Sequence, residues 1–114
     1  MLLGRGDVDI SAQDMYGTTP LSFAAQSGLL AIVKMILDIE DASADIKDHN
    51  GRVPLSYAAQ YGHLDIVQLL LGRNGIRSSN IKDNTGRTPL VYAASNEHLD
   101  IVEVLLRRND VDIN

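Results

Sequence analysis

The sequence predicts an all-α solenoid, in which similar helix-turn-helix units stack one on the next. A proline-centred phrase recurs at residues 17–25, 51–59 and 86–94, and its prolines stand 34 and then 35 residues apart. Each phrase is followed by a second apolar segment. A fixed period of this length is typical of repeats that stack, because one unit alone cannot bury its apolar faces.

Each phrase predicts a short helix that begins at its proline. Thr19 and Thr88 are suited to cap this helix, and proline at the first helical position lacks an N–H that would have no partner there. Gly28 and Gly62 are suited to end it in the left-handed conformation. Val53 takes the capping place in the second unit, which we expect to cost about 1 kcal/mol.

A second apolar helix follows the first in every unit, with an Ile-Val pair in its centre and two aliphatic residues at its end. We expect these second helices at residues 30–37, 64–71 and 99–106. A polar stretch ending in Asp-x-x-Gly precedes each phrase. Aspartate and glycine at this spacing predict a tight turn in which the glycine takes a positive φ.

These units resemble the ankyrin repeat. The resemblance rests on the turn Asp and Gly, the Thr-Pro-Leu, the Ala-Ala pair, the Gly-His of residues 62–63 and the Ile-Val-x-x-Leu-Leu. It implies an all-α ankyrin-repeat solenoid whose units are joined by β-turn or hairpin-like loops. The style is similar to that of long fungal ankyrin arrays. The chain then divides into the tail of a preceding repeat at 1–13 and three repeats at 14–47, 48–82 and 83–114.

The chain departs from the family pattern at a few positions. The family's histidine after Thr-Pro-Leu is replaced by Ser22, Ser56 and Val91, so its hydrogen bonds between turn and helix are kept only in part or lost. In the third repeat Asn96-Glu97 replaces the helix-ending glycine. We expect strain at this turn unless Asn96 supplies the left-handed residue.

The two ends of the array allow two interpretations. The last helix keeps the internal apolar pattern at Ile101, Val102 and Leu105, whereas terminal repeats normally carry a polar outer face. We expect an excerpt from a longer array, and a small stand-alone protein with imperfect caps is the alternative. Exposed apolar ends would also favour self-association.

Composition restricts the functions that are open to the chain. Its net charge of −5 argues against a nucleic-acid partner, because binding phosphates needs a basic surface. No apolar run is long enough to cross a membrane, and the absence of cysteine fits an intracellular, cytoplasmic protein. Neither a glycine-rich phosphate loop nor a Cys/His zinc spacing occurs, so we expect no cofactor and no metal.

His63 and His98 each lie two residues before an aspartate, a pattern that could indicate acid–base pairs or metal ligands. Residues two apart on a helix do not face each other, and both histidines take the same repeat position. We therefore interpret them as structural and expect no enzyme activity.

Phe23, Tyr57 and Tyr92 recur in register and could form an aromatic binding ladder. A periodic apolar stripe is more often buried, so we favour a core ladder with the tyrosine hydroxyls at its edge.

Residues that vary within the repeat register are the better candidates for recognition. The resemblance implies that partners lie on a concave side formed by turn tips and exposed faces of first helices. The candidate tip residues are Met15, Tyr16, Thr18, His49, Asn50, Arg52, Asn84, Thr85 and Arg87. The candidates at the ends of first helices are Gln26, Gln60, Tyr61, Ser95 and Asn96.

Arg52 and Arg87 occupy the same tip position in adjacent units of an acidic chain. We interpret them as contacts for a protein or peptide partner with an acidic patch; the alternative is that they are solvated or pair with turn aspartates. A rival function is that of a structural spacer in a larger protein with no binding role of its own.

We predict that the third repeat frays most easily, because it lacks the helix-ending glycine and has valine in place of the family's histidine. Hydrogen exchange followed by mass spectrometry should show its amides exchanging faster than those of the first two repeats. Stronger protection in the third repeat than elsewhere would contradict this prediction.

Overall fold

The computed structural model describes residues 12–39, 44–74 and 80–113, and these residues form three helix pairs. The helices are α1 (Pro20–Ser27), α2 (Leu30–Ile39), α3 (Pro54–Tyr61), α4 (Leu64–Asn74), α6 (Pro89–Ser95) and α7 (Leu99–Ile113). No strand occurs in this described part of the chain. The expectation of an all-α fold is thereby confirmed. All but the last two residues of the expected preceding tail, 1–13, lie outside the described residues.

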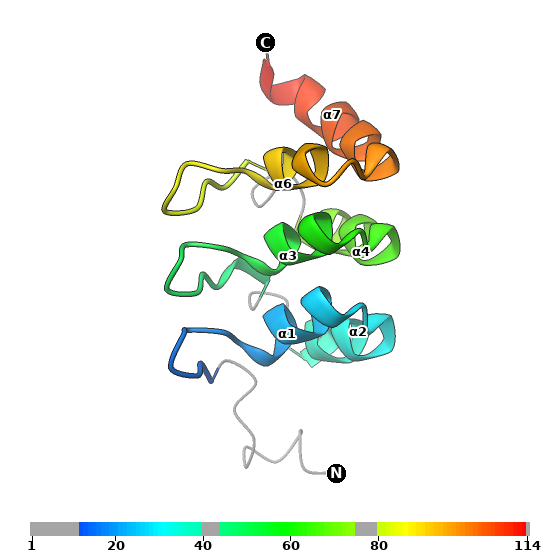
Figure 1. Ribbon diagram of the computed structural model, residues 1–114. Helices are drawn as coiled ribbons and strands as arrows, with labels where there is room; N and C mark the ends of the chain where they lie inside the picture. The colour runs from blue at the N-terminus through cyan, green and yellow to red at the C-terminus, as the bar shows by residue number, and fades with distance from the viewer. Residues whose placement is uncertain (1–11, 40–43, 75–79, 114) are drawn as a thin grey trace.

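The pairs stack along one axis, and the turns before α1, α3 and α6 project on the same side of the stack (Figure 1). First helices pack on first helices, α1 on α3 and α3 on α6, while α2, α4 and α7 form a second row. Between the rows lies a core of aliphatic side chains and of the small alanine pairs. The second helices run past their expected ends, to Ile39, Asn74 and Ile113.

The predicted caps of the first helices are confirmed. The hydroxyl oxygen of Thr19 accepts a hydrogen bond from the Ser22 N–H at 3.1 Å, and that of Thr88 accepts one from the Val91 N–H at 3.3 Å. Gly28 and Gly62 end α1 and α3 with φ of 78° and 81°. Only glycine adopts this left-handed conformation without a steric cost.

Val53 caps no N–H with its side chain, as expected, but two features offset the loss. Its own backbone N–H donates to the hydroxyl of Ser56 at 3.3 Å, which is the reverse half of a capping box. Its side chain is fully buried in the core. The serine that replaces the family's histidine therefore still joins the turn to the helix.

The left-handed residue of the third unit is Glu97, with φ of 61°, and not Asn96, so the strain expected at this turn falls on a residue that carries a Cβ. Glu97 is the positional equivalent of Gly28 and Gly62. The following N–H, that of His98, must reach the carbonyl of Ala93, which it does at 2.9 Å. Asn96 instead keeps φ of −104° and donates its side-chain amide to the Tyr92 carbonyl at 2.8 Å.

The expected aromatic core ladder holds for two of its three members. Tyr57 and Tyr92 are buried, whereas Phe23 is exposed. Tyr57 has helices packed on both sides of its unit, since α3 lies between α1 and α6. No described helix covers the outer side of α1, so the ring of Phe23 stays uncovered.

Replacing Glu97 with glycine is expected to raise the free energy of unfolding by about 1 kcal/mol, because the left-handed conformation strains a residue that carries a Cβ. Urea unfolding followed by circular dichroism measures the gain. Glu97→Ala is the matched control, since it removes the charge but keeps the Cβ. An equal gain in both variants would assign the effect to charge and contradict the backbone explanation.

Candidate functional site

A turn aspartate organises the tip in front of each first helix. In the second unit the Asp48 Oδ1 accepts the backbone N–H groups of Asn50 and Arg52, both at 2.9 Å, while Gly51 donates its N–H to the Asp48 carbonyl. Asp14 and Asp83 bind their own turns in the same way. The tip conformation therefore depends on the aspartate and the glycine and leaves the neighbouring side chains free to vary.

Adjacent turns are also bonded to each other. The His49 N–H donates to the Tyr16 carbonyl and the Asn84 N–H to the Asn50 carbonyl, both at 2.9 Å. Asn84 adds a side-chain bond to the His49 carbonyl. The contact is so close that a Cβ on Gly51 would lie 2.9 Å from the Asn84 nitrogen. The three tips thus form one continuous row.

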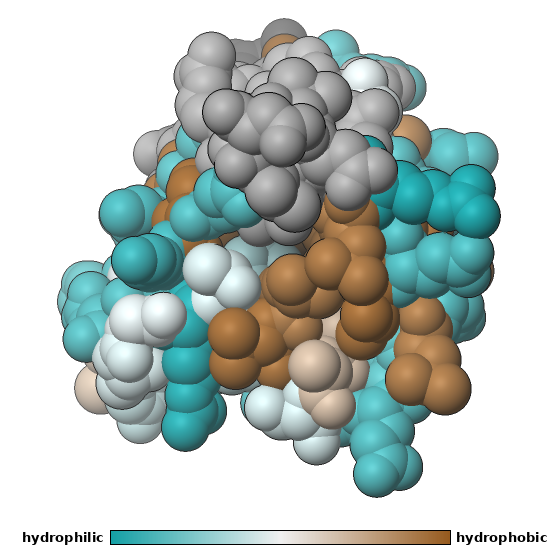
Figure 2. Space-filling view, turned by 90° about the horizontal axis from the view of Figure 1, so that it is seen from above, coloured by the Kyte–Doolittle hydropathy of each residue, from teal (hydrophilic) through white to brown (hydrophobic). Residues whose placement is uncertain are grey.

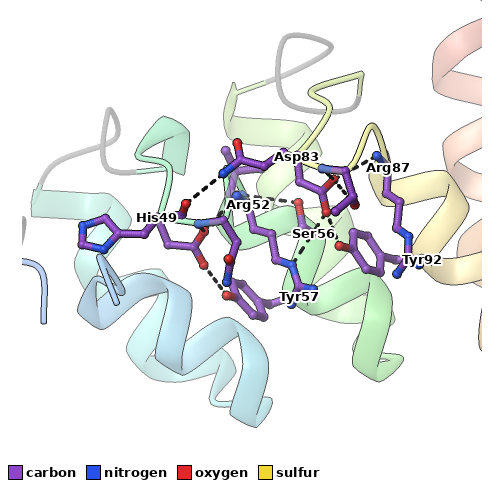
Figure 3. A network of polar contacts seen from close by, with 12 residues as sticks. His49, Arg52, Ser56, Tyr57, Asp83, Arg87 and Tyr92 are labelled. Carbon is purple, nitrogen blue, oxygen red and sulfur yellow. Dashed lines mark hydrogen bonds and ion pairs between the residues drawn. The ribbon is translucent and has the colours of Figure 1, made fainter. Parts of the chain in front are cut away.

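Behind this row, each of the two buried tyrosines joins its first helix to its own turn (Figure 3). The Tyr57 hydroxyl donates to Asp48 Oδ2, and the Tyr92 hydroxyl donates to Asp83 Oδ2. Phe23 has no hydroxyl with which to bind Asp14. The Asp-to-Tyr spacing of nine residues is present in the sequence, but we did not interpret it as a bonded pair.

One arginine lies between the two tyrosine rings, and a second lies over one of them. The Arg52 guanidinium carbon is 5.5 Å from the centroid of Tyr57 and 5.0 Å from that of Tyr92, and its Nε is 3.8 Å from Asp83 Oδ2. Arg87 lies over the same Tyr92 ring at 5.8 Å. These distances are within the range of cation–π attraction. Arg52 therefore links two units, whereas Arg87 contacts a ring of its own unit.

The environment shifts the ionisation of this network. Burial raises the pKa of Tyr57 to about 12, and its bond to the Asp48 carboxylate acts in the same direction. Burial also raises the pKa of Tyr92, as does its bond to Asp83. Burial acts to raise the pKa of Asp83, but hydrogen bonds from the Tyr92 hydroxyl and the turn N–H groups outweigh it and hold that pKa well below its usual range.

The two histidines have structural contacts. The His63 Nε2–H donates to the Gln26 carbonyl at 3.0 Å, and that of His98 donates to the Gln60 carbonyl at 3.0 Å, so each joins its unit to the preceding one. A Cβ on Gly28 would lie 2.7 Å from the ring of His63. Within residues 12–39, 44–74 and 80–113, no cluster of three His, Cys, Asp or Glu side chains suited to a metal occurs.

The structure brings the candidate recognition residues to the turn row and to the ends of the first helices. Met15 and Tyr16 are 77% and 65% exposed, the largest exposed apolar side chains of the row. Partly buried members are Thr18, Gln26, Arg52 and Gln60. The remaining exposed members are His49, Asn50, Tyr61, Asn84, Thr85, Arg87, Ser95 and Asn96.

The family follows from a comparison with known proteins. More than half of the chain, residues 37–114, matches a family model described as ankyrin repeats (3 copies), and residues 16–49 match the model of the ankyrin repeat. The chain belongs to the ankyrin-repeat family. Ankyrin repeats generally mediate protein–protein interaction, and the family is generally non-enzymatic. No curated protein matches the chain. None of the described helices is long and apolar enough to cross a membrane.

Tyr57→Phe is expected to lower the free energy of unfolding by about 1–3 kcal/mol, because it leaves one oxygen of the buried Asp48 without its hydroxyl donor. Urea unfolding measures the loss. Tyr61→Phe is the matched control, since Tyr61 is exposed, and it should change little. Equal effects of the two substitutions would show that the buried hydroxyl contributes nothing.

The same bond predicts a pH dependence. A raised pKa means that the fold favours the protonated phenol, so this stabilisation is complete below pH ~10, the usual pKa of tyrosine. It is lost as the pH rises through about 12. Thermal unfolding across this range should show a steeper loss of stability in the parent protein than in Tyr57→Phe. Parallel curves would contradict the assignment.

Proposed function

We propose that this chain binds a protein or peptide partner through its turn row and the exposed faces of α1, α3 and α6. One observation carries the proposal: the tips are held by turn aspartates, glycines and backbone bonds, yet they present large apolar side chains at Met15 and Tyr16. Side chains that the fold does not need, on a rigid row, suit a recognition surface.

Tyr61 adds a second exposed aromatic at the end of α3. Aromatic side chains are enriched at the centres of interfaces, because they bury a large area while losing little conformational freedom. Tyr16 and Tyr61 are therefore the anchors of the proposed surface, and the polar residues at His49, Asn50 and Asn84 surround them.

Arg87 is the stronger candidate for contact with an acidic group of the partner. Its side chain is exposed and lies over one ring, while Arg52 is partly buried between two rings and near Asp83. Reversing the charge of Arg52 would disturb the stack itself. Of the two arginines, only Arg87 can have its charge reversed to test partner binding without removing a contact between repeats.

The test is affinity capture with chemical cross-linking and mass spectrometry, using Met15→Ala/Tyr16→Ala/Tyr61→Ala and, separately, Arg87→Glu. The matched control is Lys34→Ala/Gln68→Ala, which changes exposed residues of α2 and α4. We expect a partner that binds the parent and the control equally well to bind the triple variant at least ten-fold more weakly.

Circular dichroism establishes that each variant is folded before capture. A partner that binds the triple variant as tightly as the parent would contradict the proposed surface. The absence of any partner above background in the parent would favour the structural spacer instead.

A further inference from the structure

Residues that are buried in the middle unit have exposed equivalents at the two ends of the stack. The middle unit covers Tyr57 and Ile66, whereas the equivalent residues of the first unit, Phe23 and Ile32, are exposed, Phe23 to 59%. With them lie the exposed side chains of Leu29 and Met35. We call Phe23, Leu29, Ile32 and Met35 the N-terminal end face.

In the third unit, a different set of repeat positions is exposed. Leu71 of the middle unit is buried and Leu64 partly buried, but their equivalents Leu106 and Leu99 are exposed, Leu99 to 75%. Val91 of α6 is exposed as well. We call Val91, Leu99 and Leu106 the C-terminal end face. Figure 2, viewed from above the stack, shows a hydrophobic patch at this end with polar residues on either side of it.

The two end faces also carry opposite charges in matching register. Arg52 fills the space between Tyr57 and Tyr92 and lies near Asp83 of the next unit. Arg87, its equivalent at the C-terminal end face, has Tyr92 on one side only among the described residues. At the opposite end, Asp14 and Phe23 are the equivalents of Asp83 and Tyr92.

A surface hollow marks the place where such an arginine would enter. It is lined by Asp14, Thr18 and Phe23, with Ala12, Gln13, Thr19 and Pro20 around them. Its walls include the same two positions, turn aspartate and first-helix aromatic, that Arg52 contacts in the next unit. The hollow therefore combines an apolar wall with a carboxylate, as a guanidinium requires.

We propose that the C-terminal end face of one copy docks on the N-terminal end face of a second copy, so that the stack continues head to tail. Arg87 then lies between Tyr92 of its own chain and Phe23 of the second copy, close to the second copy's Asp14. The contact continues the packing of α1 on α3 and of α3 on α6. It shares Arg87 with the proposed partner surface but does not depend on that function.

The contact between copies is weaker than the contacts within the chain. Leu29 stands where His63 and His98 bind the preceding unit, so that hydrogen bond is missing. Glu97 stands where Gly28 and Gly62 make room for a ring. Since the two docking faces differ from each other, the contact is heterologous and does not close on itself as a two-fold dimer would. The size of the assembly should therefore grow steadily with concentration.

Sedimentation equilibrium of the full chain over a wide concentration range tests the proposal. We expect the average mass to rise with concentration, and Ile32→Asp and Leu106→Asp each to abolish the rise. The decisive sample is their mixture: one variant keeps its C-terminal end face, the other its N-terminal end face, so the two form a one-to-one dimer and stop. Lys34→Asp, an exposed charge change on α2, is the control and should associate like the parent.

Charge reversal tests the arginine contact separately. Arg87→Glu should weaken association roughly ten-fold, whereas Arg87→Lys, which keeps the positive charge, should weaken it less. A parent chain that stays monomeric up to about 1 mM would overturn the proposal. So would dimers of Ile32→Asp alone, which would show that like faces pair. Loss of partner capture in the Met15→Ala/Tyr16→Ala/Tyr61→Ala variant, with unchanged sedimentation, would show that the two surfaces are separate.

Discussion

The structure depends on the carboxylate of the turn aspartate and on the groups that it binds. Oδ1 of Asp83 holds the turn by two backbone N–H groups, while Oδ2 binds the Tyr92 hydroxyl and lies near Arg52 of the preceding unit. One buried carboxylate thus joins a turn, a helix and a neighbouring repeat. An arginine and several hydrogen-bond donors offset the cost of burying its negative charge.

This arrangement separates the residues that hold the protein together from those that can recognise a partner. Aspartates, glycines and tyrosines hold each turn and join it to its helix, while histidines, turn backbone groups and Arg52 join neighbouring units. Met15 and Tyr16 extend from the same turns without taking part in those contacts through their side chains. A rigid row that carries variable side chains can change its partner without changing its fold.

Local signals in the sequence were sufficient to predict where the first helices begin and end, because threonine, proline and glycine act within a few residues of one another. They left open which residue of the third unit is left-handed: asparagine tolerates this conformation better, but the hydrogen bond from the His98 N–H to the Ala93 carbonyl places Glu97 there. They failed at Phe23, whose exposure depends on what packs beside its unit. The Arg52 contact joins residues of different repeats, so the sequence offered a turn aspartate only as an alternative partner and did not indicate which one.

The two sides of the middle unit carry residues that could contact each other if the unit were repeated. If residues 48–82 were duplicated, Arg52 of the first copy would meet Tyr57 and Asp48 of the second, as it now meets Tyr92 and Asp83. The ring of His63 would lie on Gly62, where His98 lies now. A duplicated third unit would instead press His98 against the Cβ of Glu97. An array of this kind can therefore lengthen from its interior more easily than from its end.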